Sequence, residues 1–230
     1  MRNNLKRLTA SERISETANA GSFEELNAKF ETYDPLNFTD YKKKIETERL
    51  KTGLNEAVIT GFCTIHHSPC VLIVMDSNFM MGSMGSIVGE KICRAFEKAM
   101  QKKLSVVAFV ASGGARMQES AYSLVQMAKT SGMVKKHNNK GLLYISVITD
   151  PTTGGVSASF ASLADIIIAE PSITYGFTGR RIIQETLKKE LPDDFQTAES
   201  ALKNGAIDMI VEREKMKSTL SDIIKLHMRL

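Results

Sequence analysis

Short apolar runs alternate with longer amphipathic segments along the second half of the chain. The runs have the length and composition of buried strands, and the segments between them are long enough for helices. The predicted order is strand, helix, strand, helix and strand over residues 104–111, 115–133, 142–149, 155–163 and 166–169. This alternation is typical of right-handed crossovers and of a mostly parallel sheet covered by helices. The pattern therefore predicts an α/β protein.

The pattern outside this stretch is less regular. Ser22 and Glu25 have the spacing of a capping box, and residues 40–51 form a charged helix that a glycine closes. The other predicted elements are strands at 57–62, 71–75 and 209–211, with helices at 182–189, 198–204 and 216–230. We therefore expect a helical lead-in over residues 1–56, followed by one core domain over residues 57–230.

A glycine-rich loop at residues 78–86 leads into a predicted helix at 87–100. This helix has an apolar stripe, and Lys91, Arg94 and Lys98 are expected on its solvent side. Glycines beside a helix N-terminus allow a ligand to approach the backbone, and the terminus attracts anions. The loop is therefore a candidate site for a phosphate-bearing ligand, whereas a solvated charged face is the alternative for the lysines.

Two of the apolar runs end in a Gly-Gly corner, Ser112-Gly113-Gly114-Ala115 and Thr153-Gly154-Gly155-Val156. A strand that turns on glycines into a helix leaves backbone N–H groups unpaired, and these can stabilise a developing negative charge. Neither corner carries a His or a Cys, so backbone amides are expected to supply the chemistry. Gly113 and Gly114 are the candidate oxyanion donors. The second corner forms either an adjacent wall of the site or a tight joint between strand and helix.

Composition narrows the class of protein. With 230 residues, 43% of them hydrophobic, the chain can bury a full core. No apolar run approaches the roughly 18 residues that a membrane span needs, and the basic N-terminus is not followed by a signal-peptide core. We therefore expect a cytoplasmic protein. A net charge of +4 suits an anionic ligand, but no motif combines aromatic and basic residues as nucleic-acid binding would require.

The cysteines do not predict a metal centre. Cys63 and Cys70 flank His66 and His67, so a metal site has to be considered. Their spacing resembles no common zinc pattern, and three irregularly spaced cysteines do not form a disulfide framework. The two histidines are interpreted as a hairpin turn, and no metal ligands are assigned.

Four segments are distinctive in sequence and in order. They are FMMGSMGSIVGE at 79–90, ASGGARMQE at 111–119, YISVITDPTTGGVSASFA at 144–161 and KNGAIDMIVE at 203–212. Together they closely resemble the carboxyltransferase beta subunit of bacterial acetyl-coenzyme A carboxylase. The similarity covers nearly the whole chain, and several motifs in one order are far more specific than a single Gly-Gly pair.

The resemblance implies a crotonase-like (ClpP/crotonase) fold of stacked β-β-α units. It implies that a separate alpha subunit completes the catalytic surface. The implied reaction transfers a carboxyl group from carboxybiotin, on a biotin carboxyl carrier protein served by biotin carboxylase, to acetyl-coenzyme A. The product is malonyl-coenzyme A for fatty acid synthesis. The candidate substrate-binding residues are Gly82, Ser83, Met84, Gly85, Arg116, Gly154 and Gly155.

The expected chemistry of this reaction agrees with the two corners. Removal of a proton from the thioester methyl creates an enolate, and two amides directed at its oxygen stabilise that charge. Biotin can supply a base once its carboxyl group leaves as carbon dioxide, so no residue is assigned to that role.

The sequence also departs from the family pattern. Family members usually begin with a four-cysteine zinc ribbon, which is not in this sequence, so zinc is not expected. Met81 and Thr178 stand where glycine and alanine are common. Two rival functions remain. A carboxyltransferase-like subunit of a malonyl decarboxylase would use the same fold and oxyanion chemistry. A crotonase hydratase or isomerase would need an acid or base beside the first corner, where Glu119 is the only nearby candidate and is interpreted as a surface or structural ion pair.

Overall fold

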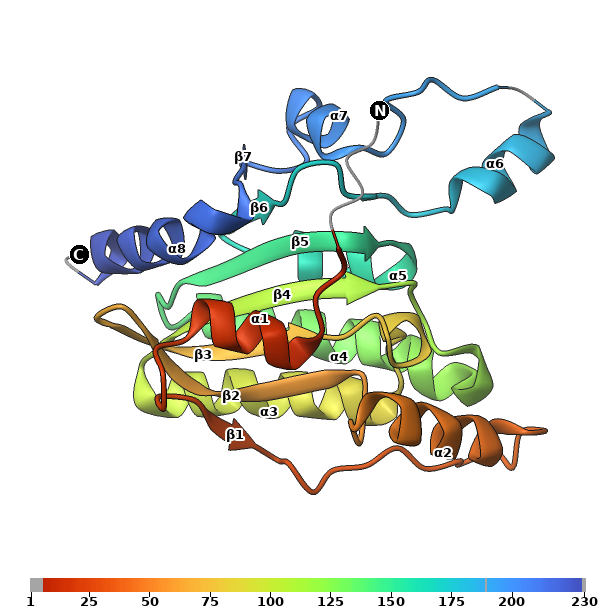
Figure 1. Cartoon of the computed structure of the whole chain (residues 1–230), viewed down its shortest axis with the longest axis horizontal. Coiled ribbons are helices and arrows are strands. Elements are labelled where there is room, and N and C mark those ends of the chain that lie inside the picture. Colours follow the sequence, from red (N-terminus) through yellow and green to blue (C-terminus); the bar gives the residue numbers. More distant parts are fainter. Residues whose placement is uncertain (1–5, 189, 229–230) are drawn as a thin grey trace.

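The computed structural model describes residues 6–188 and 190–228, which contain a sheet of seven strands in chain order (Figure 1). The first three strands pair antiparallel, and the third to the seventh pair parallel. The strands are β1 (Glu24–Leu26), β2 (Val58–Ile65), β3 (Ser68–Met75), β4 (Ser105–Ser112), β5 (Tyr144–Thr152), β6 (Ile166–Ala169) and β7 (Met209–Ile210). The predicted mostly parallel sheet is confirmed.

Helices cover both faces of the sheet (Figure 1). The α-helices are α1 (Ala10–Thr17), α2 (Tyr41–Thr52), α3 (Ser86–Lys102), α4 (Ala121–Asn138), α5 (Gly154–Ser157), α6 (Arg180–Leu187), α7 (Ala198–Lys203) and α8 (Arg213–His227). Three short 3-10 turns add η1 (Met80–Gly82), η2 (Met117–Glu119) and η3 (Phe160–Ser162). The last predicted positions of two helices, 189 and 229–230, lie outside the described residues.

The core has two layers, one on each side of the sheet. In β3, Val71 and Ile73 pack toward α3 and α4, whereas Leu72 and Val74 pack toward α1 and α8. A strand buried on both faces needs apolar residues at successive positions, because both sets of side chains leave water. This double burial explains why the central strands read as continuous apolar runs.

The N-terminal part differs from its predicted form. Glu24–Leu26 form an edge strand against β2, so Ser22 and Glu25 do not begin a helix. The capping box of this region lies instead at α1, where the Thr9 and Glu12 side chains each accept a backbone N–H of the other residue. The first 56 residues therefore add a strand to the core sheet as well as helices.

Lys91 is buried, contrary to the prediction that placed it on the solvent side of its helix. Its side chain is 3% exposed, and its ammonium nitrogen lies 3.5 Å from a carboxylate oxygen of Glu25 on β1. Burial lowers the pKa of Lys91, and the charge of Glu25 opposes that shift. The periodicity places Arg94 and Lys98 correctly, but it could not show that the N-terminal strand brings a carboxylate to Lys91.

The predicted hairpin is present. The His66-His67 turn joins β2 to β3, and the sulfur atoms of Cys63 and Cys70 lie 3.5 Å apart as free thiols. Within residues 6–188 and 190–228, no group of three His, Cys, Asp or Glu side chains could hold a metal ion. No helix in the same part of the chain is long and apolar enough to cross a membrane.

Candidate active site

The two Gly-Gly corners lie side by side at the carboxyl edge of the sheet. They follow β4 and β5, which are parallel neighbours, and Ser112 pairs in register with Thr152. The Thr153 N–H donates to the Ser112 carbonyl oxygen at 2.8 Å, which ties one corner to the other. A Cβ on Gly154 would lie 2.9 Å from the Gly114 Cα, so the two backbones touch where only glycine fits. The fold thus brings the two predicted corners into one junction.

The predicted oxyanion donors already have partners in this structure. The Gly113 N–H donates to the Met81 carbonyl oxygen at 2.8 Å, and the Gly114 N–H donates to the Ser112 hydroxyl at 3.0 Å. Gly113 is therefore not a free donor. Among the described residues of the junction, the N–H groups of Ala115 and Gly155 have no acceptor. The Gly155 nitrogen lies 3.6 Å from the place that a Cβ on Gly114 would take.

The first corner does not turn directly into a helix, contrary to the prediction for 115–133. Residues after the corner pair with the glycine-rich loop: Met84 N–H donates to Gly114 O at 2.8 Å, and Arg116 N–H donates to Met84 O at 2.9 Å. A 3-10 turn follows, and α4 begins only at Ala121. The loop carbonyl groups therefore accept the N–H groups of Gly113 and Arg116, whereas the Ala115 N–H stays without an acceptor among the described residues. The second predicted helix, 155–163, is likewise split into α5 and η3.

The glycines of the loop are required by packing. Gly82 has a φ of +65°, and a Cβ there would collide with the Ala111 carbonyl group. A Cβ on Gly85 would lie within 3.0 Å of the Glu119 carboxyl carbon and of an Arg116 nitrogen. Both glycines and Met84 are buried beneath the site surface, whereas Ser83 is half-buried and lines the groove beside it.

Arg116 is fully buried, and its guanidinium group faces protein atoms. It donates to both carboxylate oxygens of Glu56 at 2.6 and 2.8 Å and to the Ser83 carbonyl oxygen at 2.7 Å. Burial alone would lower the pKa of Arg116, but the charge and hydrogen bonds of Glu56 raise it above its usual value. The side chain fastens the glycine-rich loop to the start of β2. Its hydrogen bonds give it a positioning role, and its contact with substrate stays a prediction because Arg116 also lies along the neighbouring groove.

Glu119 is also buried, and both of its carboxylate oxygens accept hydrogen bonds from other residues of the protein. One of its oxygens accepts the Ser86 N–H at 2.6 Å and the Ser86 hydroxyl at 2.7 Å, which caps the N-terminus of α3. The other accepts the Tyr41 hydroxyl at 2.7 Å, and burial raises the pKa of that phenol. A buried carboxylate that accepts three hydrogen bonds is a structural group, so the geometry offers no acid or base for a hydratase at this position.

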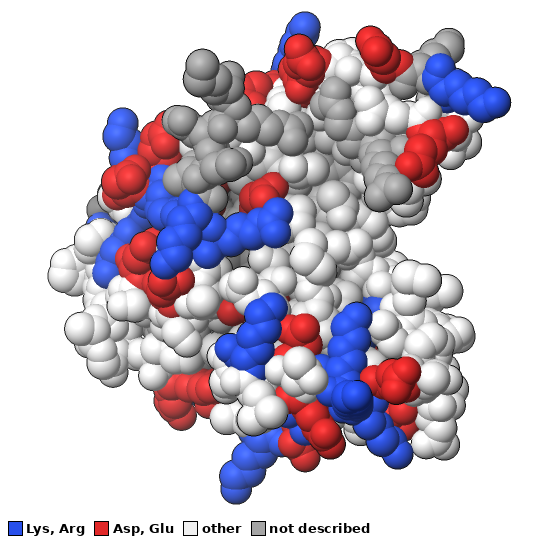
Figure 2. All heavy atoms as spheres, turned by 45° about the vertical axis from the view of Figure 1, so that its right-hand side comes forward, with Lys and Arg blue, Asp and Glu red and all other residues white. Residues whose placement is uncertain are grey.

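A groove of about 530 Å³ runs from the first corner toward α2. Its floor includes Ser83, Gly113 and Ala115, and its apolar side is formed by Met80 and Met81. The lining also includes charged side chains, and these are Arg7, Lys44, Glu48, Lys51 and Arg116. Figure 2 shows the hollowed side of the molecule, with lysine and arginine side chains gathered among acidic ones in its lower part, where α2 lies in Figure 1.

Except for Arg116, the cations that line this groove lie outside the sequence motifs. Lys44, Glu48 and Lys51 are spaced by four and three residues, so they share one face of α2. That spacing is a usable signal for a shared charged face, but the sequence of this helix shows no contrast between an apolar and a polar face that would indicate which side meets the core. Nothing in the spacing of motifs indicated that Arg7, more than a hundred residues away, would reach the second corner.

The family is established by direct comparison. The model of the carboxyl transferase domain family matches residues 3–225, which is nearly the whole chain. The chain therefore belongs to the carboxyl transferase domain family. Its fold is crotonase-like, as the resemblance implied.

Among individual relatives, the beta subunit of the acetyl-coenzyme A carboxylase carboxyl transferase from Desulforamulus reducens is 57% identical over 221 residues. That match covers 96% of this chain and 77% of the relative. Transcarboxylase 12S superposes with a TM-score of 0.82 at 26% identity, over 96% of this chain and 41% of that one. A Pseudomonas malonate decarboxylase hetero-dimer gives a TM-score of 0.75 at 19% identity, over 95% of this chain and 86% of that chain, and shows the fold alone.

Proposed function

We propose that this chain is the beta subunit of an acetyl-coenzyme A carboxylase carboxyltransferase, which forms malonyl-coenzyme A from acetyl-coenzyme A. The 57% identity to a protein of that name, over 96% of the chain, is the observation that carries the proposal. The rival malonate decarboxylase shares the fold at 19% identity, which supports no particular activity. A location in the cytoplasm and the absence of zinc stay predictions.

The oxyanion site is proposed to use one amide from each corner. Gly155 has a free N–H, and the Gly114 N–H is held by a side-chain hydroxyl that can rotate away. Both lie at the contact between the corners. An enolate oxygen held there would receive two hydrogen bonds, each of which contributes about 3–4 kcal/mol to transition-state stabilisation in well-studied oxyanion sites. This revises the predicted pair by replacing Gly113 with Gly155.

The groove is proposed to bind the coenzyme A thioester. Lys44 and Lys51 supply two cations to the wall where phosphate groups would lie, because ammonium groups bind phosphate as point charges. Met80 and Met81 give the opposite side an apolar surface that suits the pantetheine chain. The thioester end would then reach Gly113 and Ala115 beside the junction.

The carboxyl group is proposed to come from biotin on a separate carrier protein. Bound carboxybiotin would supply both the carboxyl group and, after its loss, a basic nitrogen. The composition of the described groove lining supports this role for biotin, because the lining contains one carboxylate, Glu48 on α2, and no histidine or cysteine. The residues of this chain therefore hold the thioester and stabilise charge, and they are not assigned a proton transfer.

The partner that completes the site is proposed to bind the start of α4. Tyr122, Leu124 and Val125 are exposed there, whereas Ser123 and Gln126 are buried against the rest of the molecule. A helix that turns apolar side chains outward and polar ones inward has an unpaired apolar face. An alpha subunit seated on this face would lie next to η2 and the first corner. Biotin carboxylase and the carrier protein complete the proposed assembly.

Reconstitution with a candidate alpha subunit tests the function. The complex should form malonyl-coenzyme A from acetyl-coenzyme A and carboxylated carrier protein, and the isolated chain should show little activity. Full turnover by the isolated chain, or no turnover by a correctly assembled complex, would contradict the proposal.

Gly155→Pro tests the oxyanion assignment, because proline removes the N–H at a position within the first turn of α5. The expected loss in kcat is about 10²–10³, the usual effect of losing one such donor. Gly155→Ala is the matched control, since it adds the same Cβ toward the flexible Met127 side chain and keeps the N–H. Equal activity of the two folded, assembled variants would remove Gly155 from the site.

A further inference from the structure

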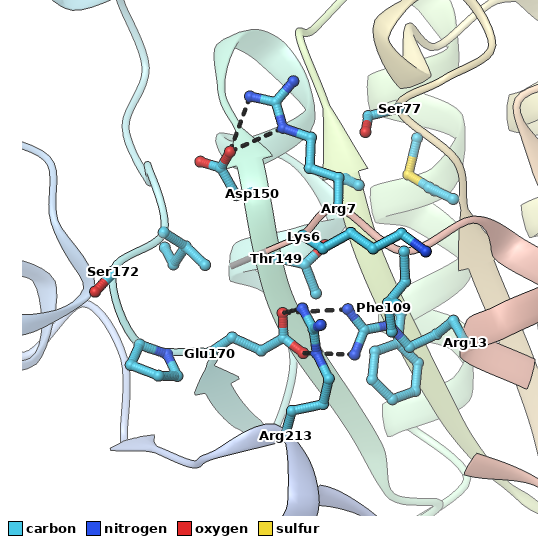
Figure 3. Close-up of a pocket in the computed structure, with 15 residues that line it drawn as sticks. Lys6, Arg7, Arg13, Ser77, Phe109, Thr149, Asp150, Glu170, Ser172 and Arg213 are labelled. Carbon is cyan, nitrogen blue, oxygen red and sulfur yellow. Dashed lines mark hydrogen bonds and ion pairs between the residues drawn. The ribbon is translucent and has the colours of Figure 1, made fainter. Parts of the chain in front are cut away.

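Arg7 lies in the segment before α1, and its side chain reaches Asp150 near the end of β5, just before the second corner. Its Nε and Nη2 atoms both donate to the Asp150 Oδ2 atom, at 3.0 and 2.9 Å. Figure 3 shows the Arg7 side chain extending away from Arg13 and Glu170 toward Asp150. The two residues are 143 positions apart in sequence, so the contact joins the N-terminal segment to the end of β5.

Asp150 connects this contact to the backbone that forms the corner. Its other oxygen, Oδ1, accepts the Thr174 N–H at 3.0 Å. The segment that begins at Thr174 runs along the corner: Thr152 N–H donates to Thr174 O at 2.9 Å, and Gly154 N–H donates to Phe177 O at 2.8 Å. Asp150 therefore holds the strand end and the neighbouring segment together, four residues before the first glycine of the corner.

The Arg7 end of the contact is fixed by α1. The Ala10 N–H donates to the buried Asp76 carboxylate at 2.7 Å, and the Thr9–Glu12 capping box closes the first turn. Arg13, one helical turn later, forms an ion pair with the buried carboxylate of Glu170. Arg7 thus lies two residues before the anchored N-cap of α1, which keeps its backbone close to the end of β5.

Because the Arg7–Asp150 ion pair is exposed to solvent, its effect on the position of the corner can be distinguished from its effect on folding stability. The side chains are 46% and 31% exposed, and ion pairs of this kind contribute only about 0–1 kcal/mol to folding. Both guanidinium donors nevertheless meet a single carboxylate oxygen, a geometry that lysine cannot reproduce. A contact that matters little for folding can still decide where a nearby amide points, because misplacement by about 1 Å can cost 10²-fold in rate.

We propose that Arg7 is a positioning residue for the carboxyltransferase reaction, which acts through Asp150 to hold the second corner so that the Gly155 N–H faces the reacting oxygen. The inference rests on the proposed function. It adds the N-terminal segment to the parts of the chain on which turnover depends.

The test uses the reconstituted complex with acetyl-coenzyme A and carboxylated carrier protein. Arg7→Gln should lower kcat by about 10- to 100-fold, with the KM for acetyl-coenzyme A changed by less than about twofold. Arg7→Lys keeps the positive charge but lacks the planar guanidinium group with its two N–H donors to Asp150. It should therefore recover only part of the kcat that Arg7→Gln loses. Asp150→Asn should resemble Arg7→Gln, and the double variant should be no worse than the poorer single one, because both changes remove one contact.

Lys6→Gln is the matched control. It removes one positive charge from the adjacent residue, whose ammonium group pairs with the exposed Glu12 and does not contact the corner. It should leave kcat and KM at their parental values, and the melting temperatures of all these variants should stay close to that of the parent.

Three outcomes would overturn the inference while the parental complex is active. A raised KM with unchanged kcat would show that Arg7 binds the thioester directly from its place in the groove wall. Additive losses in the double variant would show that the two residues act separately. Parental kcat in Arg7→Gln would show that the corner holds its position without the contact. An inactive parental complex would instead contradict the proposed function.

Discussion

At the scale of single residues, two charged side chains that the sequence associates with chemistry serve the architecture of the site. Arg116 and Glu119 belong to a conspicuous motif, ASGGARMQE, and such motifs are usually interpreted as substrate-binding. Their partners, Glu56 and Tyr41, come from segments that periodicity analysis treats as peripheral. The type of residue was therefore predictable from the sequence, whereas its role depends on contacts between segments about 60 to 80 positions apart.

Arg116→Met should lower the free energy of unfolding by about 3–5 kcal/mol, because it leaves the buried Glu56 carboxylate without its cation. Urea unfolding of the isolated chain measures this loss. The companion variant Arg116→Met/Glu56→Leu removes both charges and should recover much of the stability. A normally stable Arg116→Met variant with a raised KM for acetyl-coenzyme A would instead restore the predicted substrate contact.

At the scale of elements, strands were easier to predict than helix starts. The segments that form β3, β4 and β5 are apolar at successive positions because both faces of these strands are buried. This pattern is distinct enough to identify the strands from sequence. The helix predicted from Ala115 starts six residues later, because pairing with Met84 holds residues 114–116 in an extended form. Both Gly-Gly corners were recognised from sequence. Which of their amides stay free depends on the loop at 80–84 and could not be inferred.

The outward apolar face of α4 leads to a prediction at the same scale. Val125→Asp should leave the isolated chain folded, since this side chain is 60% exposed, and it should weaken binding of the alpha subunit by at least tenfold. Leu226→Asp, on the exposed face of α8 and 66% exposed, is the matched control. Analytical ultracentrifugation of each variant with the alpha subunit measures the change. Equal binding by both variants would place the interface elsewhere.

At the scale of the whole molecule, the sheet determines where the chemistry can occur. Because β4 and β5 are parallel neighbours, their carboxyl ends meet at one edge, and the loops that follow them share that edge. The helices on both faces cover the rest of the sheet. The class and order of elements could be predicted because they follow from local patterns. The groove could not, since α2 forms its charged wall from outside the alternating region.

Global stability should depend on pH through His137, a buried residue in the last turn of α4 that packs against Phe96 of α3. Burial lowers its pKa, although the Leu104 carbonyl oxygen and the charge of Asp165 oppose the shift, and its Nδ1 has no partner among the described residues. The unfolded chain then binds more protons than the native one as pH falls below about 6.5, so acidification favours unfolding.

The measurement is urea unfolding at a series of pH values between 7.5 and 5. The parental chain should lose stability toward pH 5, by at most about 1.4 kcal/mol per pH unit from this one group. His137→Gln should show a shallower dependence over the same range. An unchanged slope would show that His137 titrates alike in the folded and unfolded chains.

The backbone contact between Gly114 and Gly154 limits how this enzyme can be redesigned. A Cβ on Gly154 would lie 2.9 Å from the Cα of Gly114. Because the atom it meets belongs to the backbone, no second substitution can make room by replacing a side chain with a smaller one. In variants selected from mutant libraries for activity on a new acyl substrate, both glycines should therefore be retained, and the selected substitutions should lie along the groove. Exposed positions such as Met81 can vary there without moving the strands. If the proposed sites are correct, substitutions that change substrate preference can accumulate in the groove while the junction between the two corners stays constant.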